Sequence, residues 1–150
     1  MLAASAAGVH HQHMTTTRVA IDAPTCRELL RRGALLSADH RLVAPAVLRS
    51  DVLALLFAEV RAGTLAEAEG RRELDRFAEL SVRLLGDRVS RSRAWAIARD
   101  LGWDDPRPAE YLAVAVLQAD VLVTVDPHLV EGARGRVPVV PLAGVLAGAG

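Results

Sequence analysis

Two aspartates of the chain each stand directly after a short apolar run that is rich in β-branched residues. Asp22 follows the run 19–21, and Asp126 follows the run 121–125. Such runs, which lack a helical period, are typical of the buried strands of a parallel sheet. Ligands of open α/β sheets bind just outside the carboxyl ends of the strands. We therefore expect both carboxylates to lie at one edge of a sheet.

A third aspartate, Asp51, lies inside the apolar stripe of a helical segment. The apolar residues of this stripe stand three and four positions to either side of it: Val47, Leu48, Ala54 and Leu55. The carboxylate of Asp51 is therefore expected to point inward, where a charge is costly unless a positive group meets it. Mg²⁺ or Mn²⁺, which prefer oxygen ligands, would offset the repulsion among Asp22, Asp51 and Asp126.

Each of these carboxylates also has a purely structural interpretation. Asp22 and Asp126 stand shortly before Pro24 and Pro127. Aspartate ahead of proline is typical of a helix N-terminus, where the aspartate caps the helix. Asp51 could instead form an ion pair with a buried arginine. Both alternatives stay open at the level of the sequence.

The elements that would position these residues alternate between strands and helices. Strands are expected at 18–21, 41–43, 82–85, 121–125 and 137–140, and helices at 24–32, 45–62, 65–79, 88–101 and 107–118. Pro45 is expected to open the second helix and Gly70 to break the third. Three charged residues of the third helix are interpreted as its solvated face: Arg71, Glu73 and Asp75. This alternation predicts an α/β fold, a three-layer α/β/α sandwich with a mostly parallel central sheet.

The size of the chain, 150 residues of which 51% are hydrophobic, suits one globular domain. We assign this domain to residues 18–142, a disordered leader to 1–17 and a flexible tail to 143–150. The single cysteine, Cys26, cannot form an internal disulfide. No apolar run reaches the about 20 residues that a membrane-spanning helix needs. We therefore expect a cytoplasmic protein that does not enter the membrane.

The charge of the chain is balanced, with 18 basic residues, all arginine, against 18 acidic ones. This balance argues against a non-specific, polybasic nucleic-acid binder. A local cluster remains at the start of the helix 88–101, where Arg88 and Arg91 could hold an RNA backbone or simply face solvent. Trp95 and Trp103 are interpreted as core anchors. The sequence has no Gly-rich phosphate loop that would support nucleotide hydrolysis.

The order of these features resembles the PIN-domain ribonucleases, and among them the VapC-type toxins of toxin–antitoxin pairs. The first strand ends in Asp22, and Asp51 follows Pro45 by six residues. The most specific part is an A-x-Y-x-A-x-A helix at 109–115 that leads into a strand ending in T-x-D at 124–126. The resemblance covers about residues 18 to 142.

This resemblance implies a site that holds Mg²⁺ or Mn²⁺ through acidic residues at the carboxyl edge of the sheet. The family's acids fall on Asp22, Asp51 and Asp126, with Thr124 as the usual hydroxyl neighbour. A further family aspartate falls on Pro108, which has no side-chain oxygen. Asp105, three residues earlier, is the nearest substitute as a metal ligand, although it also suits a helix cap.

The resemblance further implies a function and a set of partners. The protein would be a metal-dependent endoribonuclease that cleaves RNA, and the toxin of a toxin–antitoxin pair. Its partners would be RNA, a cognate antitoxin protein and a second copy in a homodimer. The alternative, suggested by Pro108, is a PIN-like domain with weak or lost catalysis that acts as a binding or regulatory module.

Overall fold

The computed structural model describes residues 16–33 and 36–148, so most of the expected leader lies outside the described residues. Strands and helices alternate along the chain as the sequence predicts. In chain order the elements are β1 (Thr17–Ile21), α2 (Ala23–Arg32), β2 (His40–Pro45), α3 (Leu48–Arg61), α4 (Glu67–Glu79), β3 (Val82–Leu85), α5 (Arg88–Leu101), α6 (Ala109–Gln118), β4 (Val121–Val123), α7 (Pro127–Ala133) and the 3-10 helix η1 (Leu142–Val145).

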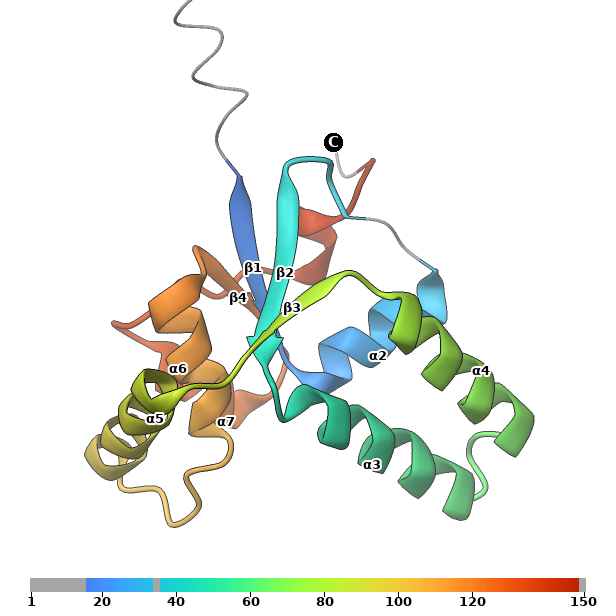
Figure 1. The fold of residues 1–150 in the computed structure, drawn as a ribbon, viewed down its shortest axis with the longest axis horizontal. Helices are drawn as coiled ribbons and strands as arrows, with labels where there is room; N and C mark the ends of the chain where they lie inside the picture. Colours follow the sequence, from blue (N-terminus) through green and yellow to red (C-terminus); the bar gives the residue numbers. More distant parts are fainter. Residues whose placement is uncertain (1–15, 34–35, 149–150) are drawn as a thin grey trace, which may run out of the picture.

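The four strands form one sheet in the order β3-β2-β1-β4, and every pairing in it is parallel. Figure 1 shows α2, α3 and α4 on one side of the sheet and α5, α6 and α7 on the other. The expected three-layer α/β/α sandwich is therefore confirmed. Because β1 and β4 are neighbours with Ile21 opposite Val123, the residues that follow these strands emerge at the same edge.

Local signals in the sequence explain where the helices begin and end. Asp22 caps the start of α2, and Gly33 ends that helix in the left-handed conformation with φ of 59°. Asp87 and Ser90 form a capping box at the start of α5. The A-x-Y-x-A-x-A segment forms α6, whose buried face packs on β1 and β2. Small alanines let this helix lie close to the sheet.

Two expectations that involve proline need correction. Pro45 does not open a helix but ends β2, because the pairing with β3 continues through the Ala46 N–H, which bonds Leu85 O at 2.9 Å. The segment 137–140 lies beside β4 and exchanges hydrogen bonds with Leu122, but forms only an isolated bridge at Val139. Prolines at 138 and 141 remove the N–H donors that a longer ladder requires.

The third expected helix also differs from its prediction. Gly70 does not break α4; it lets α4 approach α3, because a Cβ at this position would lie 3.0 Å from Val60 Cγ2. Glu73 is not part of a solvated face, since only 2% of the residue is exposed.

Trp95 is not a core anchor, since it is 70% exposed. Trp103 is half-buried and stacks on His128, with 3.8 Å between ring centroids.

The C-terminal part holds two elements that the sequence analysis did not predict. α7 follows Asp126, and η1 buries Val145 within the region assigned to a flexible tail. The backbone N–H of Ser37 bonds Val145 O at 3.0 Å, so the packed structure extends beyond residue 142. Within the described residues, no helix is long and apolar enough to cross a membrane.

Candidate functional site

A solvent-open pocket of about 670 Å³ lies at the carboxyl edge of the sheet. We call it the acidic pocket, because the four aspartates named from the sequence line it: Asp22, Asp51, Asp105 and Asp126. They come from the ends of β1 and β4, the first turn of α3 and the loop before α6. Pro108 and Tyr111 complete one wall. All four aspartates thus border one hollow at the strand ends.

Asp22 is the most buried of these carboxylates, with 3% of the residue exposed. Its Oδ1 accepts a hydrogen bond of 3.0 Å from the backbone N–H of Thr25, which caps α2. Its Oδ2 accepts a bond of 2.5 Å from the hydroxyl of Thr124. The capping interpretation of Asp22 is thus correct, and it leaves a buried carboxylate whose two donors are both neutral.

Thr124 links the two strand-end aspartates. Its hydroxyl donates to Asp22 Oδ2 and accepts a bond of 3.1 Å from the backbone N–H of Asp126. Because its single proton is used on Asp22 and the residue is 6% exposed, Thr124 positions a carboxylate and has no proton left to donate to a substrate. Asp126 is half-buried and caps α7 through the His128 N–H at 2.9 Å.

Asp51 points inward from the first turn of α3, as its place in the apolar stripe predicts. Its partner is not an arginine: Oδ2 accepts a hydrogen bond of 2.5 Å from the Tyr111 hydroxyl. The buried arginine of the described residues, Arg27, pairs instead with Glu59 in the last turns of α3 and with Glu73 on α4. The ion-pair alternative for Asp51 is therefore wrong.

Negative charge concentrates around the Tyr111 phenol. Burial raises the pKa of Tyr111 above its ordinary range, and the carboxylates of Asp51, Asp22 and Glu110 raise it further. Burial and the nearby Asp51 also raise the pKa of Glu110, while Arg91 lowers it. Tyr111 and Glu110 were not among the predicted site residues. The tyrosine of the A-x-Y motif was the signal that could have identified Tyr111.

Asp105, the proposed substitute for the missing acid, is already engaged. Both of its oxygens accept hydrogen bonds from the guanidinium of Arg107, at 2.8 to 3.0 Å. These bonds lower the pKa of Asp105. Asp105 does not cap α6 either, because the N-cap position is held by Pro108, which makes no side-chain bond there. The wall of the pocket nearest α6 thus presents an ion pair and a proline.

The acidic pocket suits a hard cation by the type of its ligands, which are carboxylate oxygens. None of the described ion pairs involves Asp22, Asp51 or Asp126. However, within 16–33 and 36–148 no three His, Cys, Asp or Glu side chains lie close enough together to hold one metal ion. The aspartates share one pocket without converging as a three-ligand cluster.

Arg88 and Arg91, the predicted phosphate contacts, lie exposed on the first turns of α5. Ser90, between them, exchanges hydrogen bonds with Asp87 in the capping box that begins α5. Arg91 lines a smaller hollow of about 200 Å³ together with Trp95, Arg107 and Glu110. Because Arg107 also lines the acidic pocket, the two hollows adjoin.

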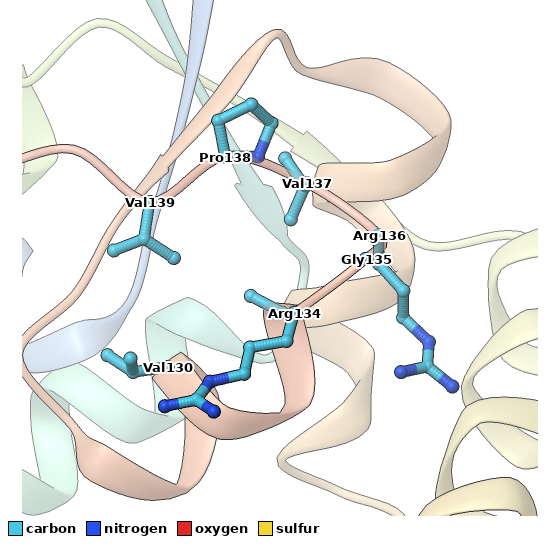
Figure 2. A pocket seen from close by; sticks show the side chains of 8 residues that line it. Val130, Arg134, Gly135, Arg136, Val137, Pro138 and Val139 are labelled. Atoms are coloured by element: carbon cyan, nitrogen blue, oxygen red, sulfur yellow. The ribbon is translucent and has the colours of Figure 1, made fainter.

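Two other hollows lack this concentration of acids. One of about 480 Å³ lies where α7 meets the segment 134–139 (Figure 2), and no acidic residue lines it. In Figure 2 the Arg134 side chain extends toward Val130, while Arg136 points the opposite way. The other, of about 530 Å³, lies between α3 and α4 beside the exposed Leu53 and Phe57. The acidic pocket is therefore the best candidate site in the described structure.

Comparison with known proteins bears on the fold alone. No family model matches the chain, and no curated protein matches it. Among solved structures, the chain is similar to the crystal structure of PAE2754 from Pyrobaculum aerophilum, with a TM-score of 0.64. The two chains are 22% identical, and the match covers 82% of this chain and 89% of that one. This likeness supports the α/β/α architecture.

Proposed function

We propose that this protein is a metal-dependent endoribonuclease of the PIN type, the toxin of a toxin–antitoxin pair, with the acidic pocket as its active site. One observation carries the proposal. Asp22 and Asp51 border the same open pocket, and both accept hydrogen bonds from neutral donors only. A carboxylate that is buried without a positive partner is costly, and a divalent cation in the pocket would compensate its charge.

In this proposal Asp22, Asp51 and Asp126 hold Mg²⁺ or Mn²⁺. The metal, when bound, would lower the pKa of a water molecule and offset charge on the phosphodiester. The chain itself supplies positioning: Thr124 orients Asp22, and Tyr111 orients Asp51. Arg107, at the edge of the pocket, keeps its Nη1 group free of hydrogen bonds within the described residues and suits a phosphate oxygen.

A second candidate function is a PIN-like domain without efficient cleavage that acts as a binding or regulatory module. Three observations favour it. Pro108 offers no ligand, Arg107 occupies both oxygens of Asp105, and three acidic groups do not converge within the part of the chain described. The two candidates differ in whether the pocket turns over substrate.

Cleavage of total cellular RNA in the presence of Mn²⁺ separates them. We expect the wild type to cleave and Asp51→Asn to lose activity. Asp75→Asn is the matched control, because Asp75 is an exposed aspartate of α4 that does not line the pocket. Activity that survives Asp51→Asn would contradict the proposed site. A silent wild type that still binds RNA would favour the second candidate.

The toxin role has its own test. Induced expression of the wild type is expected to arrest growth of a bacterial host, and Asp51→Asn is expected to be tolerated at equal protein level. Co-expression of the product of an adjacent small gene should relieve the arrest and co-purify with the protein. Equal growth with both variants would contradict the toxin role, whatever the outcome with purified RNA.

A further inference from the structure

Trp95 is unusual in this structure because a large aromatic side chain on a well-packed helix faces solvent. It is 70% exposed, whereas Ala94 next to it is buried against the core. Arg91 and Arg88 precede Trp95 by four and seven positions, so the three side chains follow one face of α5. The indole of Trp95 therefore lies in line with the guanidinium groups of Arg88 and Arg91 along this face.

This face of α5 carries uncompensated positive charge. Arg88 and Arg91 are exposed, and neither forms an ion pair in the described structure. The other side of α5 packs on α6. A ligand of this face would therefore be anionic and would have a flat group able to stack on the indole.

The hollow beside Trp95 has the features of a site for one planar ring. Its volume is about 200 Å³. Trp95 and Pro106 provide apolar walls, Arg91 and Arg107 provide donors, and the half-buried Glu110 provides an acceptor. Because Arg107 lines this hollow and the acidic pocket alike, a chain bound here continues toward the acidic pocket.

We infer that this hollow is a base-binding subsite for single-stranded RNA, in which an unpaired base stacks on Trp95. Arg91 binds an adjoining phosphate, and Glu110 accepts a hydrogen bond from an amino group on the base. Single-strand binding sites combine a cationic groove with aromatic platforms in this way. The inference rests on the proposed function, since it places a base beside the pocket where the phosphodiester would be cut.

The acceptor at Glu110 gives the subsite a preference. An ionised carboxylate can only accept hydrogen bonds. Opposite position 4 of a pyrimidine it therefore suits cytosine, whose N4 amino group donates, and disfavours uracil, whose O4 accepts. A glutamine at this position can donate as well as accept. Burial and, secondly, Asp51 raise the pKa of Glu110, whereas Arg91 lowers it, so the preference requires a pH at which the carboxylate is ionised.

The test is fluorescence anisotropy with labelled oligocytidine and oligouridine in EDTA, where no metal-dependent cleavage occurs. Trp95→Ala is expected to weaken oligocytidine binding roughly 5- to 100-fold, and Trp95→Phe to recover part of the loss. Phe57→Ala is the matched control, because Phe57 is 64% exposed but lies on α3. Glu110→Gln is expected to reduce the preference for oligocytidine.

Unchanged RNA binding by Trp95→Ala would overturn the inference. So would a variant that binds RNA normally but loses a dimer or an antitoxin partner in light scattering, since Trp95 would then belong to a protein interface. Binding in EDTA that depends on Trp95, without any Mn²⁺-dependent cleavage, would contradict the proposed nuclease and leave the subsite standing. If cleavage depends on Asp51 but RNA binding does not depend on Trp95, the proposed nuclease would be supported and the base-binding subsite would be contradicted.

Discussion

The hydroxyl of Tyr111 donates a 2.5 Å hydrogen bond to Oδ2 of Asp51, and this contact joins α6 to α3 across the acidic pocket. It fixes the carboxylate that the apolar stripe of α3 turns inward. A neutral donor holds the carboxylate without neutralising it, so the charge remains available to a cation. Tyr111 is itself 6% exposed, and its removal would disturb the pocket from within.

Replacing Tyr111 by phenylalanine is expected to lower the free energy of unfolding by about 1 to 2 kcal/mol. Hydrogen bonds to charged groups contribute about 1.5 to 3 kcal/mol, and the loss is reduced here because water in the open pocket can reach Asp51. Urea denaturation in EDTA measures it. In an Asp51→Asn background the same substitution should cost less, because the charged acceptor is gone. Equal effects in both backgrounds would show that the bond contributes little.

Mn²⁺ or Mg²⁺ is expected to raise the melting temperature, because a cation in the acidic pocket relieves the charge of Asp22 and Asp51. At about 100 times the dissociation constant the gain is about 2.7 kcal/mol, or roughly 5 to 10 °C for a domain of this size. Calorimetry of EDTA-treated protein measures the shift. Asp51→Asn should reduce it and Asp75→Asn should not. An equal shift with NaCl of matched ionic strength would indicate screening and not binding.

Replacing Pro108 by aspartate is expected to increase Mn²⁺-dependent RNA cleavage. Pro108 lines the acidic pocket at the N-cap of α6. An aspartate there adds a carboxylate to the pocket and also suits the helix start. The comparison variant is Asp105→Ala: if Asp105 already served as the missing ligand, this change would abolish activity and Pro108→Asp would add little. Because Arg107 holds Asp105, we expect Asp105→Ala to retain most of the activity.

The placement of the aspartates could be predicted because it follows from local patterns. A β-branched run that ends just before Asp22 locates β1 and its end. The run before Asp126 locates β4, although this strand ends at Val123 and not at residue 125 as predicted. The partners of those side chains could not be predicted. Tyr111 lies 60 residues from Asp51, and the two meet only because α3 and α6, from opposite sides of the sheet, both reach its carboxyl edge.

Other errors arose where the sequence pattern conflicts with packing. Glu73 occurs in a run of charged residues, which indicates a solvated face, yet it is buried against Arg27 of α2. Trp95 is a large aromatic residue of the kind that usually anchors a core, yet α5 turns it outward and buries Ala94 and Ile97 instead. Hydrophobicity of a residue type predicts burial on average, whereas the phase of the helix decides the individual case.

The buried thiol of Cys26 makes the free energy of unfolding depend on pH. Burial, and secondly the charge of Asp22, raise its pKa from 9.0 to about 12. The folded state therefore keeps the proton when the unfolded state has lost it, so the contribution to stability is complete below pH 9.0 and falls between pH 9.0 and about 12. Cys26→Ala should be less stable overall, but its stability should decline less steeply than that of the wild type between pH 9.0 and about 12. Parallel slopes in urea denaturation would contradict the assignment.

The last prediction concerns the buried ion pairs of Arg27, which join three helices. Its Nε bonds Glu73 at 3.2 Å and its Nη1 bonds Glu59 at 2.7 Å. Glu73 has a side chain that is 2% exposed, so Arg27→Met would leave its charge buried and unpaired. We expect a loss of about 3 to 5 kcal/mol in the free energy of unfolding.

Two further variants separate the charge effect from lost packing. Arg31→Met, on the same helix, removes an exposed arginine whose pair with Glu28 lies at the surface, and it should change stability by at most about 0.5 kcal/mol. Adding Glu73→Leu to Arg27→Met removes the stranded carboxylate, so the double variant should recover much of the stability. A double variant as unstable as Arg27→Met alone would mean that Arg27 acts through the packing of its side chain and not through its charge.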